Sequence, residues 1–180
     1  MRFENHIAIV TGGGSGIGRA TCVQLASEGA KVAVVDIDFE QGQETLAQIQ
    51  HSGGEAMFLK ADVSNAADVQ GAVSRVVEIW GRVDVLVNNA GTMSFSPVVS
   101  LHEDAWDRVL AVNLRAAFLF AKYTLPHMKG ADGRKSGAIV NISSVHASAT
   151  TRNVAAYAAS KGGLEAFTRA LAIEAEAVNV

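Results

Sequence analysis

An α/β fold, with a parallel sheet covered by helices on both faces, is predicted by three features of the sequence. Short apolar runs rich in β-branched residues alternate five times with longer segments of helical periodicity. The short runs are apolar at nearly every position, which is typical of strands buried on both faces. A glycine cluster joins the first such run to the first helical segment. Together these features favour a doubly wound parallel sheet.

The composition is that of an ordered globular domain, and it argues against several classes of protein. The chain has 180 residues, 49% of them hydrophobic, which is enough for one domain with a core. The net charge of −3 and the lack of a basic stripe argue against nucleic acid as a partner. Cys22 is the only cysteine, so we expect neither an internal disulfide nor a cysteine metal cluster, and we place Cys22 in the core.

We expect no membrane contact and no metal site. The first six residues run directly into a strand pattern, without the apolar stretch of a signal peptide. No apolar run approaches the roughly 18 residues that a membrane span needs. The histidines and acidic residues show no metal-ligand spacing such as His-Glu-x-x-His. A cytoplasmic location is therefore the expectation.

The individual elements follow from periodicity and from capping or turn residues. Strands are predicted at His6–Thr11, Lys31–Asp36, Glu55–Ala61, Val83–Val87 and Gly137–Ile142. Helices are predicted at Gly16–Glu28, Phe39–His51, a segment capped by Ser64 that ends at Trp80, Glu103–Met128 and Ala155–Ala172. A polar loop is predicted over residues 129–136. Right-handed crossovers then give a Rossmann-like sheet with the strand order 3-2-1-4-5, in a single domain over residues 1–180.

The glycine cluster has the context of a phosphate-binding turn. Gly12, Gly16 and Gly18 follow a strand and open a helix, so the backbone can turn tightly and a diphosphate can approach it closely. The free N–H groups and the positive dipole end of the helix, with Ser15 and Ile17 in the same turn, favour an anion there. A dinucleotide-binding turn is therefore predicted.

An acidic residue stands where such a fold binds the adenosine ribose. Asp36 ends the second strand, and a carboxylate at that place accepts hydrogen bonds from ribose hydroxyls and repels a 2′-phosphate. Ile37 beside it offers no positive charge. These two residues favour NAD over NADP as the cofactor, although an Asp at a strand end also caps turns.

The last predicted helix carries a tyrosine and a lysine four residues apart, which places Tyr157 and Lys161 on one face. A free phenol, with a pKa of about 10, is a poor base at neutral pH. One positive charge about 4 Å away, in a partly wet site, favours the ionised phenol by roughly 4 kcal/mol. The pattern therefore predicts a pair that exchanges a proton with a substrate. The alternative is an interfacial Tyr and a solvated Lys that share a helix face by chance.

Several motifs in register give the chain a resemblance to the short-chain dehydrogenase/reductase family. The glycine turn from Thr11 to Gly18 looks like the family's cofactor turn. Asp62-Val63 looks like its adenine-contacting pair, and Asn88-Asn89-Ala90-Gly91 like its motif after the fourth strand. Asn113, Ser144, Tyr157 and Lys161 look like its four catalytic residues. The resemblance covers essentially the whole chain.

This resemblance implies a role for each of these residues. Tyr157 would be the general acid for carbonyl reduction and the base for alcohol oxidation, and Lys161 would assist it and hold the nicotinamide ribose. Ser144 would bind the substrate oxygen, with Ser143 as the alternative. Asn113 would hold a water that connects Lys161 to solvent. Asn89, Ala90 and Gly91 would shape the loop beside the nicotinamide.

The resemblance therefore implies an NAD-dependent oxidoreductase that acts on a small secondary alcohol or ketone. Two alternatives stay open: a non-catalytic NAD-binding module, and an NADPH-dependent 3-oxoacyl-carrier-protein reductase, against which Asp36 speaks. A homodimer or homotetramer through the helices Glu103–Met128 and Ala155–Ala172 is expected. The family's later strands and substrate lid have no counterpart after Val180, so we expect a partial member whose fifth strand is an open, apolar edge.

Overall fold

The computed structural model describes residues 1–128, 137–176 and 180. The predicted loop over residues 129–136 lies outside these described residues. Five parallel strands form one sheet in the order β3-β2-β1-β4-β5, which confirms the predicted topology. The strands are β1 (Ile7–Thr11), β2 (Lys31–Asp36), β3 (Ala56–Lys60), β4 (Val85–Asn88) and β5 (Ala138–Asn141).

Strand β1 lies in the middle of the sheet and is paired on both sides. It pairs with β2 from Ile7 opposite Lys31, and with β4 from Ala8 opposite Val85. All five of its residues are buried. The glycine turn that follows β1 therefore projects from a central, fully buried strand, at the carboxyl ends of the strands, where parallel sheets bind ligands.

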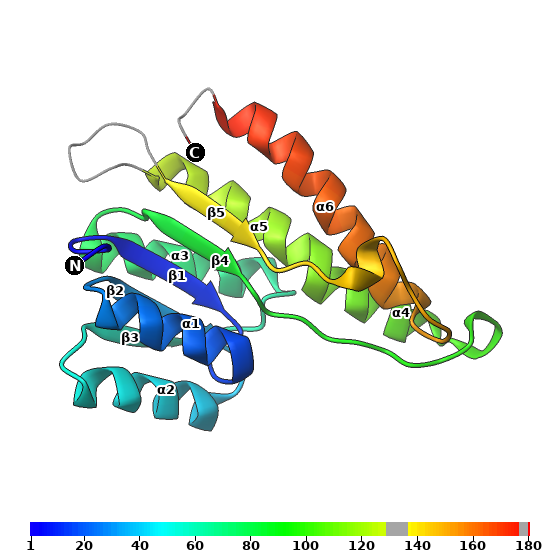
Figure 1. Cartoon of the computed structure of the whole chain (residues 1–180), viewed down its shortest axis with the longest axis horizontal. Coiled ribbons are helices and arrows are strands. Elements are labelled where there is room, and N and C mark those ends of the chain that lie inside the picture. Colours follow the sequence, from blue (N-terminus) through cyan, green and yellow to red (C-terminus); the bar gives the residue numbers. More distant parts are fainter. Residues whose placement is uncertain (129–136, 177–179) are drawn as a thin grey trace.

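Helices cover the two faces of the sheet in the manner expected from the alternating pattern (Figure 1). The helices are α1 (Gly16–Ser27), α2 (Phe39–His51), α3 (Ala66–Trp80), α4 (Glu103–Leu110), α5 (Ala116–Thr124) and α6 (Ala155–Glu176). Ala8 and Val10 of β1 pack toward α1 and α2, whereas Ile7 and Ile9 pack toward α3 and α5. This alternation follows from the two-residue period of a strand.

One predicted helix is divided in the structure. The segment Glu103–Met128 consists of α4, a π-helical turn over Ala111–Arg115, α5, and a 3-10 turn over Leu125–His127. The π turn contains Asn113, whose side-chain amide is hydrogen-bonded outside its own helix. Pro126 lies in the final turn, and it has no N–H with which to continue an α-helix.

The predicted N-cap of α3 was wrong by one residue. Asn65 is the cap, and its side-chain oxygen accepts a hydrogen bond of 2.9 Å from the backbone N–H of Ala67. Ser64 instead donates its hydroxyl to Asp62 Oδ1 at 2.7 Å. The last helix also runs four residues beyond its predicted end at Ala172, to Glu176.

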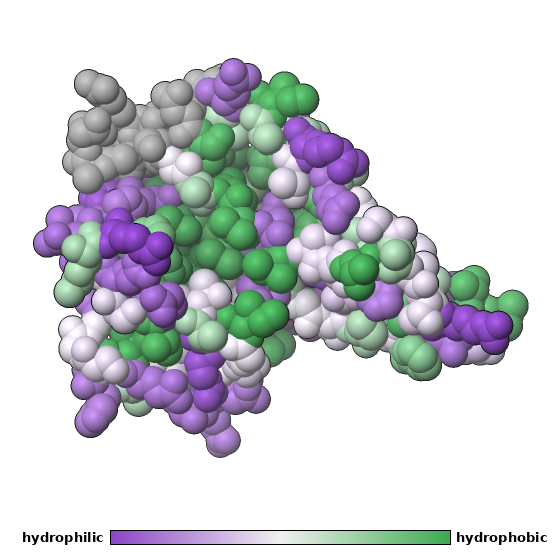
Figure 2. All heavy atoms as spheres, in the orientation of Figure 1, coloured by the Kyte–Doolittle hydropathy of each residue, from purple (hydrophilic) through white to green (hydrophobic). Residues whose placement is uncertain are grey.

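Strand β5 forms one edge of the sheet, as predicted. Its exposed fraction alternates along the strand, and Val140 is 46% exposed. Figure 2 shows hydrophobic residues gathered on the part of the molecule that lies between α1 and α6 in this view. A hollow of about 280 Å³ beside β5 is lined by Ile139 and by Leu171 and Ala175 of α6. The edge therefore offers apolar side chains as well as free backbone groups.

The turn between β1 and α1 is packed too tightly for a side chain at Gly18. A Cβ there would overlap the carbonyl oxygen of Gly12 and lie 2.5 Å from Asn89 Nδ2. Gly12 has a φ of +63°, a conformation that favours glycine. The start of α1 is thus held directly against the turn.

We expect Gly18→Ala to destabilise the chain by about 1–3 kcal/mol, because the added methyl forces the turn and the helix apart. The matched control is Gly71→Ala in α3, where an added Cβ meets no atom within 4 Å and alanine favours the helix. Urea unfolding followed by circular dichroism measures both variants. Equal stability of the two variants would contradict the close packing.

We also expect the thiol of Cys22 to be unreactive in the native chain. Cys22 is fully buried, and this burial raises the pKa of its thiol to about 12. A thiol with a raised pKa carries almost no thiolate at pH 8, whereas an unfolded chain regains a pKa of about 8.5. A disulfide reagent such as dithionitrobenzoate should label the urea-unfolded chain and spare the native one. Equal labelling rates would show that the core opens readily around Cys22.

Candidate functional site

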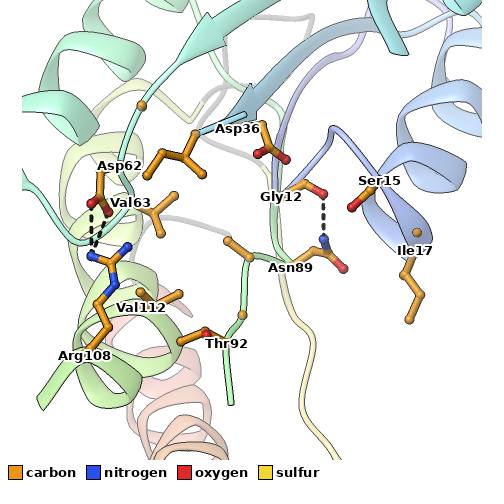
Figure 3. A pocket seen from close by; sticks show the side chains of 15 residues that line it. Gly12, Ser15, Ile17, Asp36, Asp62, Val63, Asn89, Thr92, Arg108 and Val112 are labelled. Carbon is orange, nitrogen blue, oxygen red and sulfur yellow. Dashed lines mark hydrogen bonds and ion pairs between the residues drawn. The ribbon is translucent and has the colours of Figure 1, made fainter. Parts of the chain in front are cut away.

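The ends of β1 and β4 are tied together beside the glycine turn. Asn89 Nδ2 donates to the carbonyl oxygens of Thr11 and Gly12, at 3.0 and 3.1 Å (Figure 3). Thr11 Oγ1 in turn accepts from the backbone N–H groups of Asn89 and Ala90, both at 3.0 Å. These bonds fix the loop after β4 relative to the turn after β1, as expected for strand ends that build one site.

A cavity of about 490 Å³ lies at these strand ends. Eleven of the predicted cofactor residues line it: Gly12, Ser15, Gly16, Ile17, Asp36, Ile37, Asp62, Val63, Asn89, Ala90 and Gly91. Gly18, which was also predicted, does not line the cavity and instead packs beneath the turn. Ala61, Thr92, Arg108 and Val112 complete the lining.

Sequence reasoning missed these last four residues for different reasons. Thr92 directly follows the Asn-Asn-Ala-Gly motif, and Ala61 directly precedes Asp62, so extending either motif by one residue would have included them. Arg108 and Val112 belong to helical segments whose face toward the cavity depends on how the helix packs. No local pattern marks them.

Asp36 holds the end of β2 to the glycine turn. Its Oδ2 accepts from the backbone N–H of Gly14 at 2.8 Å, and its Oδ1 accepts from that of Asp38 at 3.0 Å. Each carboxylate oxygen has a second lone pair for a ligand donor. The capping interpretation and the ligand-binding interpretation of Asp36 are therefore compatible.

Tyr157 and Lys161 line a second hollow, of about 350 Å³, together with Ser143, Met93 and Ile142. This hollow shares Ile17, Asn89, Gly91 and Thr92 with the larger cavity, so the two adjoin. A ligand that extends from the glycine turn toward α6 would therefore reach the pair.

Lys161 is a buried cation in this hollow. Its side chain is directed at the loop from β5, where Nζ donates to the carbonyl oxygen of Ile142 at 2.6 Å. Nζ lies 5.7 Å from the centre of the Tyr157 ring. The residue is only 3% exposed, and burial lowers the pKa of its ammonium group. The sequence placed the two side chains on one helix face, and the structure directs them into one space.

Asn113 connects three segments around this hollow. Its Oδ1 accepts from the backbone N–H of Thr92 at 2.8 Å, and its Nδ2 donates to the Thr92 carbonyl and to Ser160 Oγ, both at 2.9 Å. Ser160 donates to the carbonyl of Tyr157 at 2.7 Å. Asn113 thus bonds to distant segments and not to its own helix. The predicted water beside it stays a prediction.

The two candidate serines differ in their bonding. Ser143 donates its hydroxyl to Glu165 Oε1 at 3.0 Å and lines the hollow. Ser144 Oγ accepts from the backbone N–H of His146 at 3.2 Å and does not line it. Within residues 1–128, 137–176 and 180, Ser144 donates to no protein group, so its proton is available to a ligand.

His146 lies beside Tyr157 in a T-shaped arrangement, with the ring planes at 77° and the ring centres 5.7 Å apart. Its Nδ1 is 3.1 Å from Thr150 Oγ1. Among the described residues no carboxylate is within ion-pair distance of His146, so it has no acidic partner for a Ser-His-Asp arrangement.

No helix in the described part of the chain is long and apolar enough for a bilayer. The same residues contain no group of three or more metal-ligating side chains.

Comparison with known proteins identifies the family. The chain matches the family model for short chain dehydrogenases over residues 6–180. Cyclopentanol dehydrogenase of Comamonas sp. is 37% identical over 179 residues, which make up 99% of this chain and 70% of that protein. An NAD+-bound xylitol dehydrogenase structure has a TM-score of 0.93 at 34% identity, and the match covers 99% of this chain and 68% of that one.

A third comparison bears on the cofactor. A metagenomic short-chain oxidoreductase in complex with NADP has a TM-score of 0.92 at 36% identity, with 98% of this chain and 79% of that chain covered. Structures similar to this chain thus bind NAD+ or NADP, and each of the three relatives is longer than this chain. The family match over residues 6–180 and the shared Rossmann fold show that the chain belongs to the short-chain dehydrogenase family of oxidoreductases.

Proposed function

We propose that the chain forms one dinucleotide-binding domain of an NAD-dependent oxidoreductase that transfers a hydride between nicotinamide and a small secondary alcohol or ketone. The observation that carries this proposal is the buried Lys161 ammonium, which faces the Tyr157 ring in a hollow that adjoins the glycine-turn cavity. Burying a charge costs free energy, and structures retain such charges where they have a task.

The larger cavity fits an adenine dinucleotide. At Gly16, which lines it, a Cβ would meet no protein atom within 4 Å, so the backbone there faces open space. Ser15 and Gly16, at the start of α1, present backbone N–H groups to a diphosphate. Asp36 would accept from ribose hydroxyls and oppose a 2′-phosphate, which supports NAD over NADP.

The bound nicotinamide would supply the hydride acceptor for oxidation, or the donor for reduction. In the direction of oxidation, Tyr157 takes the proton of the substrate hydroxyl as the hydride leaves the carbinol carbon. The ammonium of Lys161 stabilises the negative charge that Tyr157 carries before it accepts this proton. In the reverse direction Tyr157 donates the proton to the carbonyl oxygen.

Ser144 would donate its hydroxyl to the substrate oxygen and stabilise the charge that develops there. Ser143, which lines the hollow as Ser144 does not, is the alternative donor. Asn113 holds Thr92 on one side of the hollow and, through Ser160, the turn of α6 that carries Tyr157 on the other. This link holds Thr92 and Tyr157 at a fixed separation across the hollow. It leaves the hydrogen-bonding capacity of the Tyr157 phenol and of the Lys161 ammonium unused. Asn113 therefore supports the geometry on which proton transfer depends.

An assembly of two or four copies belongs to the same proposal. Leu110, Leu114 and Phe118 line an open hollow together with Phe167 of α6, and Phe118 is 46% exposed. These residues come from the two helical segments expected to meet a second copy. Leu110 and Leu114 are half-buried, and an exposed aromatic side chain such as Phe118 is typical of protein interfaces.

The central test is Tyr157→Phe, which removes only the phenolic oxygen. We expect hydride transfer to a panel of secondary alcohols to fall by about 10²–10⁴-fold, because the proton acceptor is lost. NAD binding, measured by calorimetry, should be unchanged. The matched control is Tyr123→Phe, which is packed against the core away from the hollow. If the parent chain binds NAD and neither it nor Tyr157→Phe oxidises any alcohol, the non-catalytic binding module is the better description.

A second test uses Lys161→Met and the pH dependence of alcohol oxidation. Burial lowers the pKa of Lys161, so as pH rises the ammonium is lost earlier than that of an exposed lysine, whose pKa is about 10.4. Activity should therefore decline on the alkaline side below that value, and Lys161→Met should be nearly inactive at every pH.

The same lowered pKa fixes the sign of the stability effect. Because the folded-state pKa of Lys161 lies below the unfolded-state value, the charged lysine opposes folding at pH 7. Loss of this cost offsets the lost hydrogen bond to Ile142, so the Tm of Lys161→Met should stay within about 3 °C of the parent. A large fall in Tm would mean that Lys161 is mainly structural.

A further inference from the structure

Helix α6 carries a third ionisable side chain in register with Tyr157 and Lys161. Glu165 stands four residues after Lys161, just as Lys161 stands four residues after Tyr157, so the three side chains form one row along the helix. Glu165 is half-buried. The proposed proton transfer uses the first two residues of the row and leaves the carboxylate of the third without a task.

The two charged side chains of this row hold adjacent residues of the segment that follows β5. Lys161 Nζ donates to the carbonyl oxygen of Ile142 at 2.6 Å, and Glu165 Oε1 accepts from the hydroxyl of Ser143 at 3.0 Å. Ile142 and Ser143 both line the hollow that also contains Tyr157. An ammonium group and a carboxylate from one helix thus meet two neighbouring residues of the wall of this hollow.

Glu165 lies behind Ser143 and does not itself line the hollow. A ligand that contacts the Ser143 hydroxyl would therefore be separated from the carboxylate by about two hydrogen-bond lengths, roughly 6 Å. At that separation the carboxylate acts on a ligand through its electric field. So long as the bond to Glu165 is made, the one proton of Ser143 is in use, and its hydroxyl can only accept a hydrogen bond from a ligand.

The negative charge of Glu165 is not used to neutralise Lys161. Glu165 takes part in its bond to Ser143 as the acceptor, which is the role of an ionised carboxylate. A carboxylate in contact with Lys161 would raise the pKa of the ammonium group, whereas burial lowers that pKa. The hollow therefore contains one buried positive charge and has a separate negative charge behind its wall.

This pair of charges distinguishes the two redox forms of a nicotinamide. The ring is cationic in NAD+ and neutral in NADH, so the two forms differ by one unit of charge at the end of the ligand that the proposed function assigns to this hollow. The ammonium of Lys161 disfavours a cationic ring, and a carboxylate behind Ser143 offsets that effect.

We propose that Glu165 sets the preference of the site for the oxidised cofactor: its carboxylate, held behind Ser143, favours the cationic nicotinamide of NAD+ over the neutral ring of NADH. This inference rests on the proposed function and assigns to Glu165 a choice between the two forms of its cofactor. Glu165 makes this choice through its field and through Ser143, without touching a reacting atom.

The experiment measures the Kd of NAD+ and of NADH by calorimetry at low ionic strength, without substrate, for the parent chain and for Glu165→Gln. The amide of the variant can still accept from Ser143, so the substitution removes the charge and keeps the hydrogen bond. We expect NAD+ to bind about fivefold more weakly and NADH to change by less than about twofold. The ratio of the two Kd values cancels any effect on the parts that both dinucleotides share.

The matched control is Glu174→Gln, the same substitution at an exposed position of the same helix that does not line the hollow. It should keep the parent's ratio. High ionic strength should reduce the difference between the parent and Glu165→Gln, because salt screens a partly exposed charge, whereas a purely structural role predicts no such reduction. If Glu165→Gln fails to fold, Glu165→Ala, which also removes the charge, makes the same comparison.

Three results would overturn the inference. The first is an unchanged ratio in the folded Glu165 variant, and the second is an equal weakening of NAD+ and NADH, which would mean that Glu165 only holds Ser143 in place. Either leaves the proposed function standing, because the parent chain still binds the cofactor. A parent chain that binds neither dinucleotide would overturn the proposed function together with the role of Glu165.

Discussion

The side-chain amide of Asn113 is the contact on which the arrangement of the site depends. Three hydrogen bonds, all to groups outside its own helix, join the loop after β4 to the helix that carries Tyr157. The amide is 2% exposed, so water does not compete for these bonds. The helical segment loses regular α geometry at this residue and forms a π turn, a feature that is frequent at functional sites. The π turn thus coincides with the residue that holds the loop after β4 and helix α6 together.

The two ends of the cavity are built on different physical principles. At the glycine turn the backbone segments pack so closely that a side chain at Gly18 would overlap the carbonyl oxygen of Gly12. At the opposite end, Arg108 and Asp62 form an ion pair. Both side chains are partly exposed, so the pair adds little to stability, and its main effect is to hold the two side chains in place. The Tyr157 end relies on burial, which keeps Lys161 close to the phenol but lowers its affinity for a proton. A ligand that spanned both hollows would meet the backbone of the glycine turn, a fixed carboxylate and a buried cation.

Much of this arrangement followed from the sequence, because the signals were local. Apolar runs gave β1 and β2 almost to the residue, and the strand order followed from the general handedness of crossovers. Gly12, Gly16 and Asp36 stand at or just after strand ends, so their place in the cavity needed no knowledge of packing, whereas Gly18 packs beneath the turn. What could not be predicted depends on contacts between distant segments. Ser64 and Asn65 are both good capping residues. The hydroxyl of Ser64 is hydrogen-bonded to Asp62 and Arg108, so Asn65 caps the helix. The orientation of Arg108 is likewise set by how α4 packs, and no motif records that packing.

The pairing of β1 has a consequence for the time course of folding. On one side, Ile7 of β1 pairs with Lys31 of β2, only 24 residues later in the chain. On the other side, Ala8 pairs with Val85 of β4, which is synthesised much later. At translation rates of about 5–20 residues per second, the central strand would remain half-paired for roughly 3–11 s, the time that separates the synthesis of Lys31 from that of Val85. During that interval the nascent chain shows an apolar template to its surroundings. The site at the carboxyl ends of the strands forms only after this interval. Until then β1, which is fully buried in the folded protein, has an unpaired edge on which other chains can aggregate.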